Sequence, residues 1–267
     1  MSLLSIEFAA FFMLLFPAYW ALRPWPGAQN ALLLAASLFM LWLANPYFAA
    51  ALLVFAAGVF GVACGIAQSR HEKAKKRWLG AGAALIVANL GFFKYHDFFA
   101  AHFPAPLQEP AAALIFPLGL SWYSFQAIAY LDWLRQRPAS LALKWHELVL
   151  HLGFFPTVTS GPIFRAGLQK SVEGLHAGAA IQIQARRPRR LLNPALAVCL
   201  ILLGITKKWF LAGALAEQLV DPVFDNPMQH APLTVLTAIY GYTAQLFFDF
   251  SGYSDLVIGL AMLLGFH

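Results

Sequence analysis

Two carboxylates interrupt a strongly apolar run near the C-terminus of this 267-residue chain. Asp249 and Asp255 stand six residues apart, with Ser251 and Tyr253 between them. On a helix, Asp249 shares a face with Tyr253, and Ser251 shares a face with Asp255, because residues four apart are neighbours. An ionisable side chain inside a bilayer costs about 2.5–3.5 kcal/mol on insertion scales, so these groups are expected to face a bundle interior. They either form a hydrogen-bonding network that supports a site, which is the favoured interpretation, or act in catalysis directly.

A second segment, 151–165, holds two prolines and two glycines, which excludes a continuous helix. Gly161 and Pro162 predict a fixed turn, and Arg165 follows it. A guanidinium group can bind the phosphates of a nucleotide-bearing donor. A further positive charge at the cytoplasmic face is the favoured interpretation of Arg165. His151 is expected inside the membrane, where a structural role is favoured over a catalytic one.

Hydroxyl and amide groups also follow the helix breakers Pro117 and Gly119. Ser121 and Gln126 place these groups inside an apolar stretch. They either line a polar tunnel or only satisfy freed backbone groups and hold helices together. The sequence leaves both interpretations open.

Other cations and histidines lie near the ends of apolar stretches. Lys94 and His96 are typical of an interfacial anchor, which is favoured over a catalytic role for His96. Lys207 and Lys208 fall about two-thirds along another stretch. They predict either a helix break near Gly204 or lysines that snorkel toward the outer interface.

The composition places all these side chains in a membrane protein. Apolar residues make up 60% of the chain and charged residues 11%, against about 45–50% and about 25% in soluble domains. This share excludes a disordered chain, a disulfide scaffold and an ordinary soluble enzyme. Cys64 and Cys199 lie in apolar runs and are interpreted as core residues, so neither a disulfide nor a metal site is expected.

Seven apolar stretches predict membrane-spanning helices, because a span needs about 20 mostly apolar residues. The first lacks a basic region and a cleavage site, so we expect a retained span and not a signal peptide. A shorter apolar stretch covers 147–164. The predicted spans are 5–22, 30–45, 46–67, 78–99, 112–134, 191–220 and 232–266.

Fifteen of the 18 Lys and Arg residues fall on one side of the predicted spans. These residues are Arg23 and those of segments 69–77, 135–144 and 165–190, whereas loops 100–111 and 221–231 contain no Lys or Arg. The positive-inside rule makes the basic side cytoplasmic and places the N-terminus outside. Segments 135–144 and 165–190 share a side only if 147–164 does not cross, so we predict a re-entrant element there.

The predicted fold class is therefore all-α: a polytopic ring or bundle of transmembrane helices, with about seven crossings plus a re-entrant segment. Residues 1–267 are expected to form a single membrane domain. The basic run at 186–190 is interpreted as a cytoplasmic loop near anionic lipid headgroups, and no nucleic-acid partner is expected.

Five segments resemble the membrane-bound O-acyltransferase (MBOAT) family, in the N-terminal portion of its alginate O-acetyltransferase branch. The most specific are FFPTVTSGPIFR at 154–165 and QLFFDFSGYSDLVIG at 245–259. The others are 92–99, 117–126 and GITKKWF at 204–210, which leads to DPVF. They follow one another in family order from end to end of the chain.

The resemblance implies a multi-pass enzyme of the bacterial inner membrane, with a through-membrane tunnel. It would move an acyl group, usually acetyl, from a cytoplasmic thioester such as acetyl-CoA, which is a substrate and not a bound cofactor. Its partners would be membrane lipid, extracytoplasmic acetylation proteins and an exported polysaccharide such as alginate. The residues expected to bind substrate or line the tunnel are Gly161, Pro162, Arg165, Asp249, Ser251, Tyr253, Asp255, Ser121, Gln126 and His151.

Two departures from the family pattern limit what is carried over. The segment 132–135 reads Asp-Trp-Leu-Arg and departs from the family's Asp-x-Tyr-Arg type of ending. The family's catalytic histidine belongs to a Trp-His segment downstream of the Gly-Tyr-Ser-Asp helix. His267 follows Gly-Phe, so no catalytic residue is assigned in this chain. We expect the N-terminal part of a longer fold, completed by a further segment or a second polypeptide.

Two functions of other classes stay open at this point. The intramembrane aspartates could relay cations or protons in a transporter or flippase subunit, although the two halves show no inverted repeat of hydropathy. The basic loops could also recruit export machinery to a non-catalytic membrane scaffold.

Overall fold

The computed structural model describes residues 3–100, 115–163, 166–167, 169–171, 174–185 and 187–266. Arg165 lies outside the described residues, as do the side chains of His96 and Asp97. The chain divides into two compact units. The first unit is Met1–Thr159 with Ile163–Pro188, and the second unit is Ser160–Pro162 with Arg189–His267. That they form one membrane domain stays a prediction.

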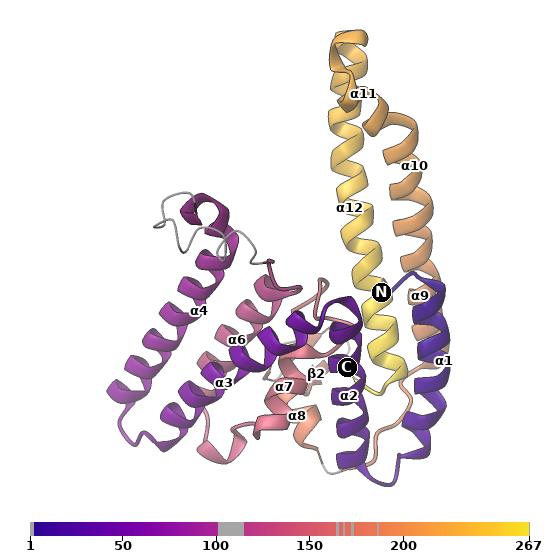
Figure 1. The fold of residues 1–267 in the computed structure, drawn as a ribbon. Coiled ribbons are helices and arrows are strands. Elements are labelled where there is room, and N and C mark those ends of the chain that lie inside the picture. Colours follow the sequence, from indigo (N-terminus) through magenta and orange to yellow (C-terminus); the bar gives the residue numbers. More distant parts are fainter. Residues whose placement is uncertain are drawn as a thin grey trace. The chain divides into compact units, whose positions relative to one another are not determined.

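The first unit begins with four apolar helices (Figure 1). They are α1 (Ile6–Ala21), α2 (Pro26–Ala44), α3 (Pro46–Gln68) and α4 (Glu72–Ala100). The Ser5 hydroxyl caps α1 by accepting from the Phe8 N–H at 3.2 Å. The Asn45 side chain caps α3 by accepting from the Tyr47 N–H at 2.9 Å. Helices α2 and α3 each start with a proline, whose fixed φ suits the first helical position.

The rest of the first unit consists of shorter elements. They are α6 (Leu120–Arg135), the 3₁₀ turn η1 (Ala139–Leu141), α7 (Trp145–Gly153), β1 (Gln169–Ser171), β2 (Gly174–His176) and α8 (Ala179–Gln184). The two strands pair antiparallel as a small hairpin. The nine residues of α7 rise about 13.5 Å, and a bilayer core is about 30 Å thick. Helix α7 is therefore too short to cross, as we predicted for 147–164.

The core of the first unit joins α3, α4, α6 and α7. Leu52, Leu131 and Leu148 are fully buried in it. A Cβ atom at Gly82 would lie 2.7 Å from Val62, so α4 approaches α3 more closely there than any larger residue allows. This core holds α6 and α7, which carry three of the predicted site residues.

The second unit is a pair of long helical segments that run side by side (Figure 1). The first comprises α9 (Pro194–Ile205), the π-helical η2 (Thr206–Ala212), α10 (Gly213–Leu215), the π-helical η3 (Ala216–Val220) and α11 (Asp221–Asp225). After the 3₁₀ turn η4 (Pro227–Gln229) comes α12 (Pro232–Leu263). A Cβ atom at Gly204 would lie 2.5 Å from the Gly252 carbonyl oxygen. The two segments therefore touch backbone to backbone, as small residues permit in membranes.

The helices confirm an all-α polytopic membrane protein. Among the described residues, five helical segments are long and apolar enough to cross a bilayer: Pro26–Ala44, Pro46–Gln68, Glu72–Tyr95, Pro194–Asp225 and Pro232–Leu263. Helices α1 and α6 occupy two further predicted spans but have 16 residues each, fewer than the roughly 20 that a span usually needs.

Candidate functional site

Lys207 of η2 joins two polar residues of α12. Its Nζ atom donates to Asp255 Oδ2 at 2.6 Å and to Ser251 Oγ at 3.1 Å. The side chains of Lys207 and Asp255 are only 22% and 19% exposed. Ser251 and Asp255 share a face of the helix as predicted, and the shared partner is a lysine.

Lys208 makes the matching arrangement with the other predicted pair. Its ammonium group forms an ion pair with Asp249 and lies 5.9 Å from the centre of the Tyr253 ring. A cation over an aromatic face at this distance is attracted by the ring quadrupole. The charges of both aspartates are therefore balanced within the second unit.

Gly252 explains how two adjacent lysines reach carboxylates that are six residues, or about 9 Å, apart along α12. A Cβ atom at Gly252 would lie 2.8 Å from the Lys208 nitrogen and 2.9 Å from the Lys207 Cβ atom. The η2 backbone thus meets α12 midway between Asp249 and Asp255. The lysine side chains then extend in opposite directions. The helix continues through Gly204 and does not break there, and the lysines bind aspartates instead of snorkelling to an interface.

The predicted turn at Gly161 and Pro162 packs on the same helix. Gly161 is buried and has a φ of +104°, a backbone conformation that favours glycine. A Cβ atom there would lie 3.5 Å from two carbons of the Tyr253 ring and 3.6 Å from Val257. The Tyr253 ring is therefore contacted both by the turn at Gly161 and by the Lys208 ammonium group.

In the first unit, the structure brings Gln126 and His151 together. Gln126 Nε2 donates to the backbone carbonyl oxygen of His151 at 2.6 Å. The His151 ring is fully buried and lies 5.8 Å from the Tyr130 ring. Both contacts fix the position of α7 on α6. Ser121 lies half-buried in the first turn of α6.

Three polar residues of α2 were missed by the sequence analysis. Ser37 Oγ accepts from the Phe155 N–H at 3.1 Å, and Asn30 Nδ2 donates to the Ile183 carbonyl oxygen at 2.8 Å. Gln29 Nε2 donates to the Tyr19 carbonyl oxygen at 3.1 Å. All three are buried and hold irregular or terminal backbone in place. The signal was present, since polar side chains inside a predicted span are expensive wherever they occur.

A cluster of charges lies where α6 ends. Arg135 forms ion pairs with Glu72 and with Asp132, the latter at 3.3 Å. The hydrogen bond to the Glu72 carboxylate raises the pKa of Arg135. These pairs join the end of α6 to the start of α4 on the side that the sequence predicts to be cytoplasmic.

The charged residues described above form fixed ion pairs that hold helices together. The described residues contain no cluster of three or more His, Cys, Asp or Glu side chains that could hold a metal ion. Asp249, Ser251 and Asp255 of α12 bind lysines, and the amide of Gln126 binds a backbone carbonyl. This arrangement can hold the turn at 160–162 against α12 and fix α12 beside the lysines of η2.

The sequence of the chain is similar to those of several known proteins. No family model matches the chain. It is 30% identical over 274 residues to the "Probable alginate O-acetylase AlgI" of Azotobacter vinelandii, a match that covers 98% of this chain and 51% of that protein. The protein of the same name from Pseudomonas aeruginosa is 30% identical, with 96% of this chain and 48% of that protein covered. A "Peptidoglycan O-acetyltransferase" of Helicobacter pylori is 30% identical, with 75% and 41% covered.

The chain thus spans about half the length of the curated relatives that it matches. Within that half, the matches run across both units and include the segments that carry the resemblance. The chain belongs to the membrane-bound O-acyltransferase family, in the branch of the alginate O-acetylases.

Proposed function

We propose that the protein represented by this chain is an O-acyltransferase that modifies an exported polysaccharide, with acetyl as the acyl group. The observation that carries the proposal is the match to alginate O-acetylases along 98% of the chain. The Helicobacter pylori relative is named for another cell-envelope polymer, peptidoglycan. What these names share is acyl transfer to a polymer, and alginate is the specific acceptor that we propose to test first.

The reaction forms a C–O bond and breaks a C–S bond. The acceptor hydroxyl oxygen attacks the carbonyl carbon of the thioester, a base takes the hydroxyl proton, and the thiolate leaves and is protonated. Histidine suits the base because its pKa lies near 6.5, and hydrogen-bond donors stabilise the oxyanion. We place this base in the part of the relatives' length that the chain does not match. None of the residues described above is assigned a catalytic role.

The residues described above act as positioning groups in this proposal. In this proposal the Gly161-Pro162 turn borders the opening for the donor, and Arg165, which follows the turn in the sequence, is the guanidinium that binds the phosphates of acetyl-CoA. Tyr253 supports the turn, because Gly161 packs on its ring. Asp249 and Asp255 fix α12 through the lysines of η2. Ser121, Gln126 and His151 belong to the first unit, and we propose them as tunnel or substrate-binding residues there.

The site implies a location and partners. We propose that the protein lies in the bacterial inner membrane with its N-terminus outside, takes acetyl-CoA or another acyl thioester from the cytoplasm and works with extracytoplasmic acetylation proteins. A second polypeptide could complete the fold. Fusions of a periplasm-dependent reporter to the N-terminus and to the basic segments test the orientation.

The structure favours neither alternative class. Both intramembrane aspartates bind lysines, so their carboxylates are poorly placed to relay protons as a transporter would require. The hypothesis of a non-catalytic membrane scaffold differs from our proposal only in predicting no acyl transfer, so an activity assay distinguishes the two.

Acyl transfer in membranes tests the proposed function. Inside-out vesicles would contain either these 267 residues alone or the chain joined to the unmatched part of the Azotobacter vinelandii relative. Labelled acetyl-CoA is added on the outward-facing cytoplasmic side, the acceptor polymer is enclosed in the vesicle lumen, and alkali-labile acetyl ester on the polymer is counted. We expect ester only with the joined protein, and a loss of 10²–10⁴-fold, about the contribution of a general base, when its downstream histidine becomes alanine.

Two outcomes would contradict this assignment. Activity of the chain alone would place the base within it, and His151 and His96 would then be changed to alanine. Absence of ester from the joined protein, with several thioesters and polymers and with normal membrane levels, would favour the scaffold.

A further inference from the structure

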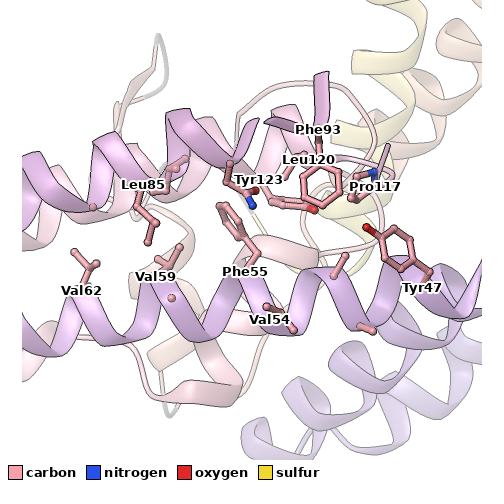
Figure 2. A pocket seen from close by; sticks show the side chains of 16 residues that line it. Tyr47, Val54, Phe55, Val59, Val62, Leu85, Phe93, Pro117, Leu120 and Tyr123 are labelled. Carbon is pink, nitrogen blue, oxygen red and sulfur yellow. The ribbon is translucent and has the colours of Figure 1, made fainter. Parts of the chain in front are cut away.

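A cavity of about 380 Å³ lies in the first unit between α3, α4 and the start of α6 (Figure 2). Ligand sites commonly have volumes of about 300–1,000 Å³. On α3 the lining side chains recur at helical spacing from Tyr47 to Val62, a rise of about 22 Å. On α4 they run from Gly82 to Phe93. The cavity is therefore elongated along the two helices.

The two ends of the cavity differ in polarity. Gly58, Val59, Val62, Gly82, Leu85 and Ile86 bound one end, which is wholly apolar. Tyr47, Asn89 and Tyr123 contribute polar groups to the remainder. The Phe55 and Tyr123 rings meet there, with centroids 4.8 Å apart (Figure 2). An occupant must therefore be apolar along most of its length and polar at one point.

Tyr123 is the residue that points to a ligand. It is 1% exposed, and its hydroxyl has no hydrogen-bond partner among the residues that the structure describes. Buried hydroxyl groups are almost always hydrogen-bonded in folded proteins. A phenol that lines a cavity and lacks a partner can be satisfied by an acceptor inside that cavity.

The edge of the cavity indicates where the ligand comes from. Val54 and Leu85 both line the cavity, yet they are 74% and 57% exposed. They belong to α3 and α4, which are both long and apolar enough to cross a bilayer. The opening is therefore apolar and lies at the depth of the hydrocarbon, where lipid and not water is the available ligand.

We propose that this cavity binds one acyl chain of a membrane glycerolipid. The chain lies along the apolar end, and the ester carbonyl accepts a hydrogen bond from the Tyr123 hydroxyl. The Asn89 amide, which also lines the cavity, can donate to the same carbonyl oxygen. The lipid is a bound ligand and not an acyl donor, so the proposal stands apart from the proposed acyltransferase activity.

Native mass spectrometry of the full protein tests the hydrogen bond with two probes. The probes are phosphatidylglycerol with ester-linked chains and the same lipid with ether-linked chains, which lack the carbonyl. Tyr123→Phe keeps the ring and removes the hydroxyl. We expect it to weaken retention of the ester lipid about fivefold, which is typical of one hydrogen bond, and to leave retention of the ether lipid unchanged. Equal effects on both lipids, or no effect, would overturn the proposal.

Photocrosslinking tests the place of binding. Phosphatidylglycerol with a diazirine in its chain is incorporated into membranes, irradiated and mapped on peptides of α3 and α4. Gly58→Leu fills the cavity, since a Cβ atom there meets only Leu85 at 3.9 Å. Gly61→Leu is the matched control, because Gly61 is exposed, does not line the cavity and has nothing within 4 Å of a Cβ atom.

We expect labelled lining peptides in the unchanged protein, a loss of at least fivefold with Gly58→Leu and no change with Gly61→Leu. Equal labelling in the two glycine variants would show that lipid binds elsewhere. Absence of label from the lining of the unchanged protein would show that another protein segment fills the cavity. Both results would overturn the proposal, and the tyrosine experiment remains decisive if Gly58→Leu does not fold.

Discussion

Gly161 packs against Tyr253, with only 3.5 Å between two ring carbons and the position of a Cβ atom at the glycine. The contact joins a turn from the middle of the sequence to a helix more than 90 residues later. Lys208 approaches the same ring. A substitution at any of these three positions is therefore expected to disturb the packing of the other two.

Gly161→Ala is expected to destabilise the protein by about 1–3 kcal/mol, because a residue with a side chain is strained at a φ of +104°. Space is not the limiting factor, since the added Cβ atom makes ordinary contacts of 3.5–3.6 Å. Equilibrium unfolding in mild detergent measures the change. Trimming the neighbour with Tyr253→Leu should give no rescue, and a rescue would show that crowding was the cause.

Tyr253→Ala is expected to loosen the turn that the ring supports. Amide hydrogen exchange at residues 160–161 should rise about tenfold, whereas Tyr253→Phe, which keeps the ring, should leave it unchanged. Lys208→Met should produce a smaller rise, because a cation near a half-buried ring contributes only about 1 kcal/mol. Identical exchange in the alanine and phenylalanine variants would mean that Tyr253 does not hold the turn.

Lys207→Met is expected to leave the carboxylate of Asp255 without its cation. Breaking a fully buried pair costs about 3–5 kcal/mol. We expect about 2 kcal/mol here, because the two side chains are 22% and 19% exposed. The double variant with Asp255→Asn removes both charges and should recover at least half of the loss. Unfolding of the four proteins in a mutant cycle gives the coupling, and additive losses would contradict an interaction.

Ser37→Ala is expected to cost about 1–3 kcal/mol, because it leaves the buried N–H group of Phe155 without its acceptor. Ser69→Ala is the matched control, since among the described residues the Ser69 hydroxyl bonds to the Gly65 carbonyl oxygen of the preceding helical turn and to no distant segment. The control should change unfolding by less than about 0.5 kcal/mol. Equal losses in the two variants would remove the role that we assign to Ser37.

The helices were readable from the sequence because hydropathy alone separates membrane spans from loops. The charge count identified 147–164 as unable to cross, and α7 has only nine residues. The pairing of Asp249 with Tyr253, and of Ser251 with Asp255, followed from helical spacing. Each pair meets one lysine in the structure.

The partners of these residues were not readable, because they depend on packing between distant segments. Lys207 and Asp255 are 48 residues apart in the sequence, and they meet because two glycines let the backbones touch. The sequence around the two lysines is compatible with snorkelling, so it does not indicate that they pair with aspartates of α12. Gln29, Asn30 and Ser37 bind backbone groups of other segments, so only the packing reveals their partners, although amides and hydroxyls inside a span need partners wherever they occur.

The Lys–Asp pairs of the second unit also constrain how the protein is made. A helix that carries both lysines, released alone into lipid, would face about 2.5–3.5 kcal/mol of insertion cost for each charge. The helix with the two aspartates would face the same difficulty. Together they form a hairpin whose charges cancel. The hairpin, and not either helical segment alone, is therefore the form in which these charges enter the membrane at the lowest cost.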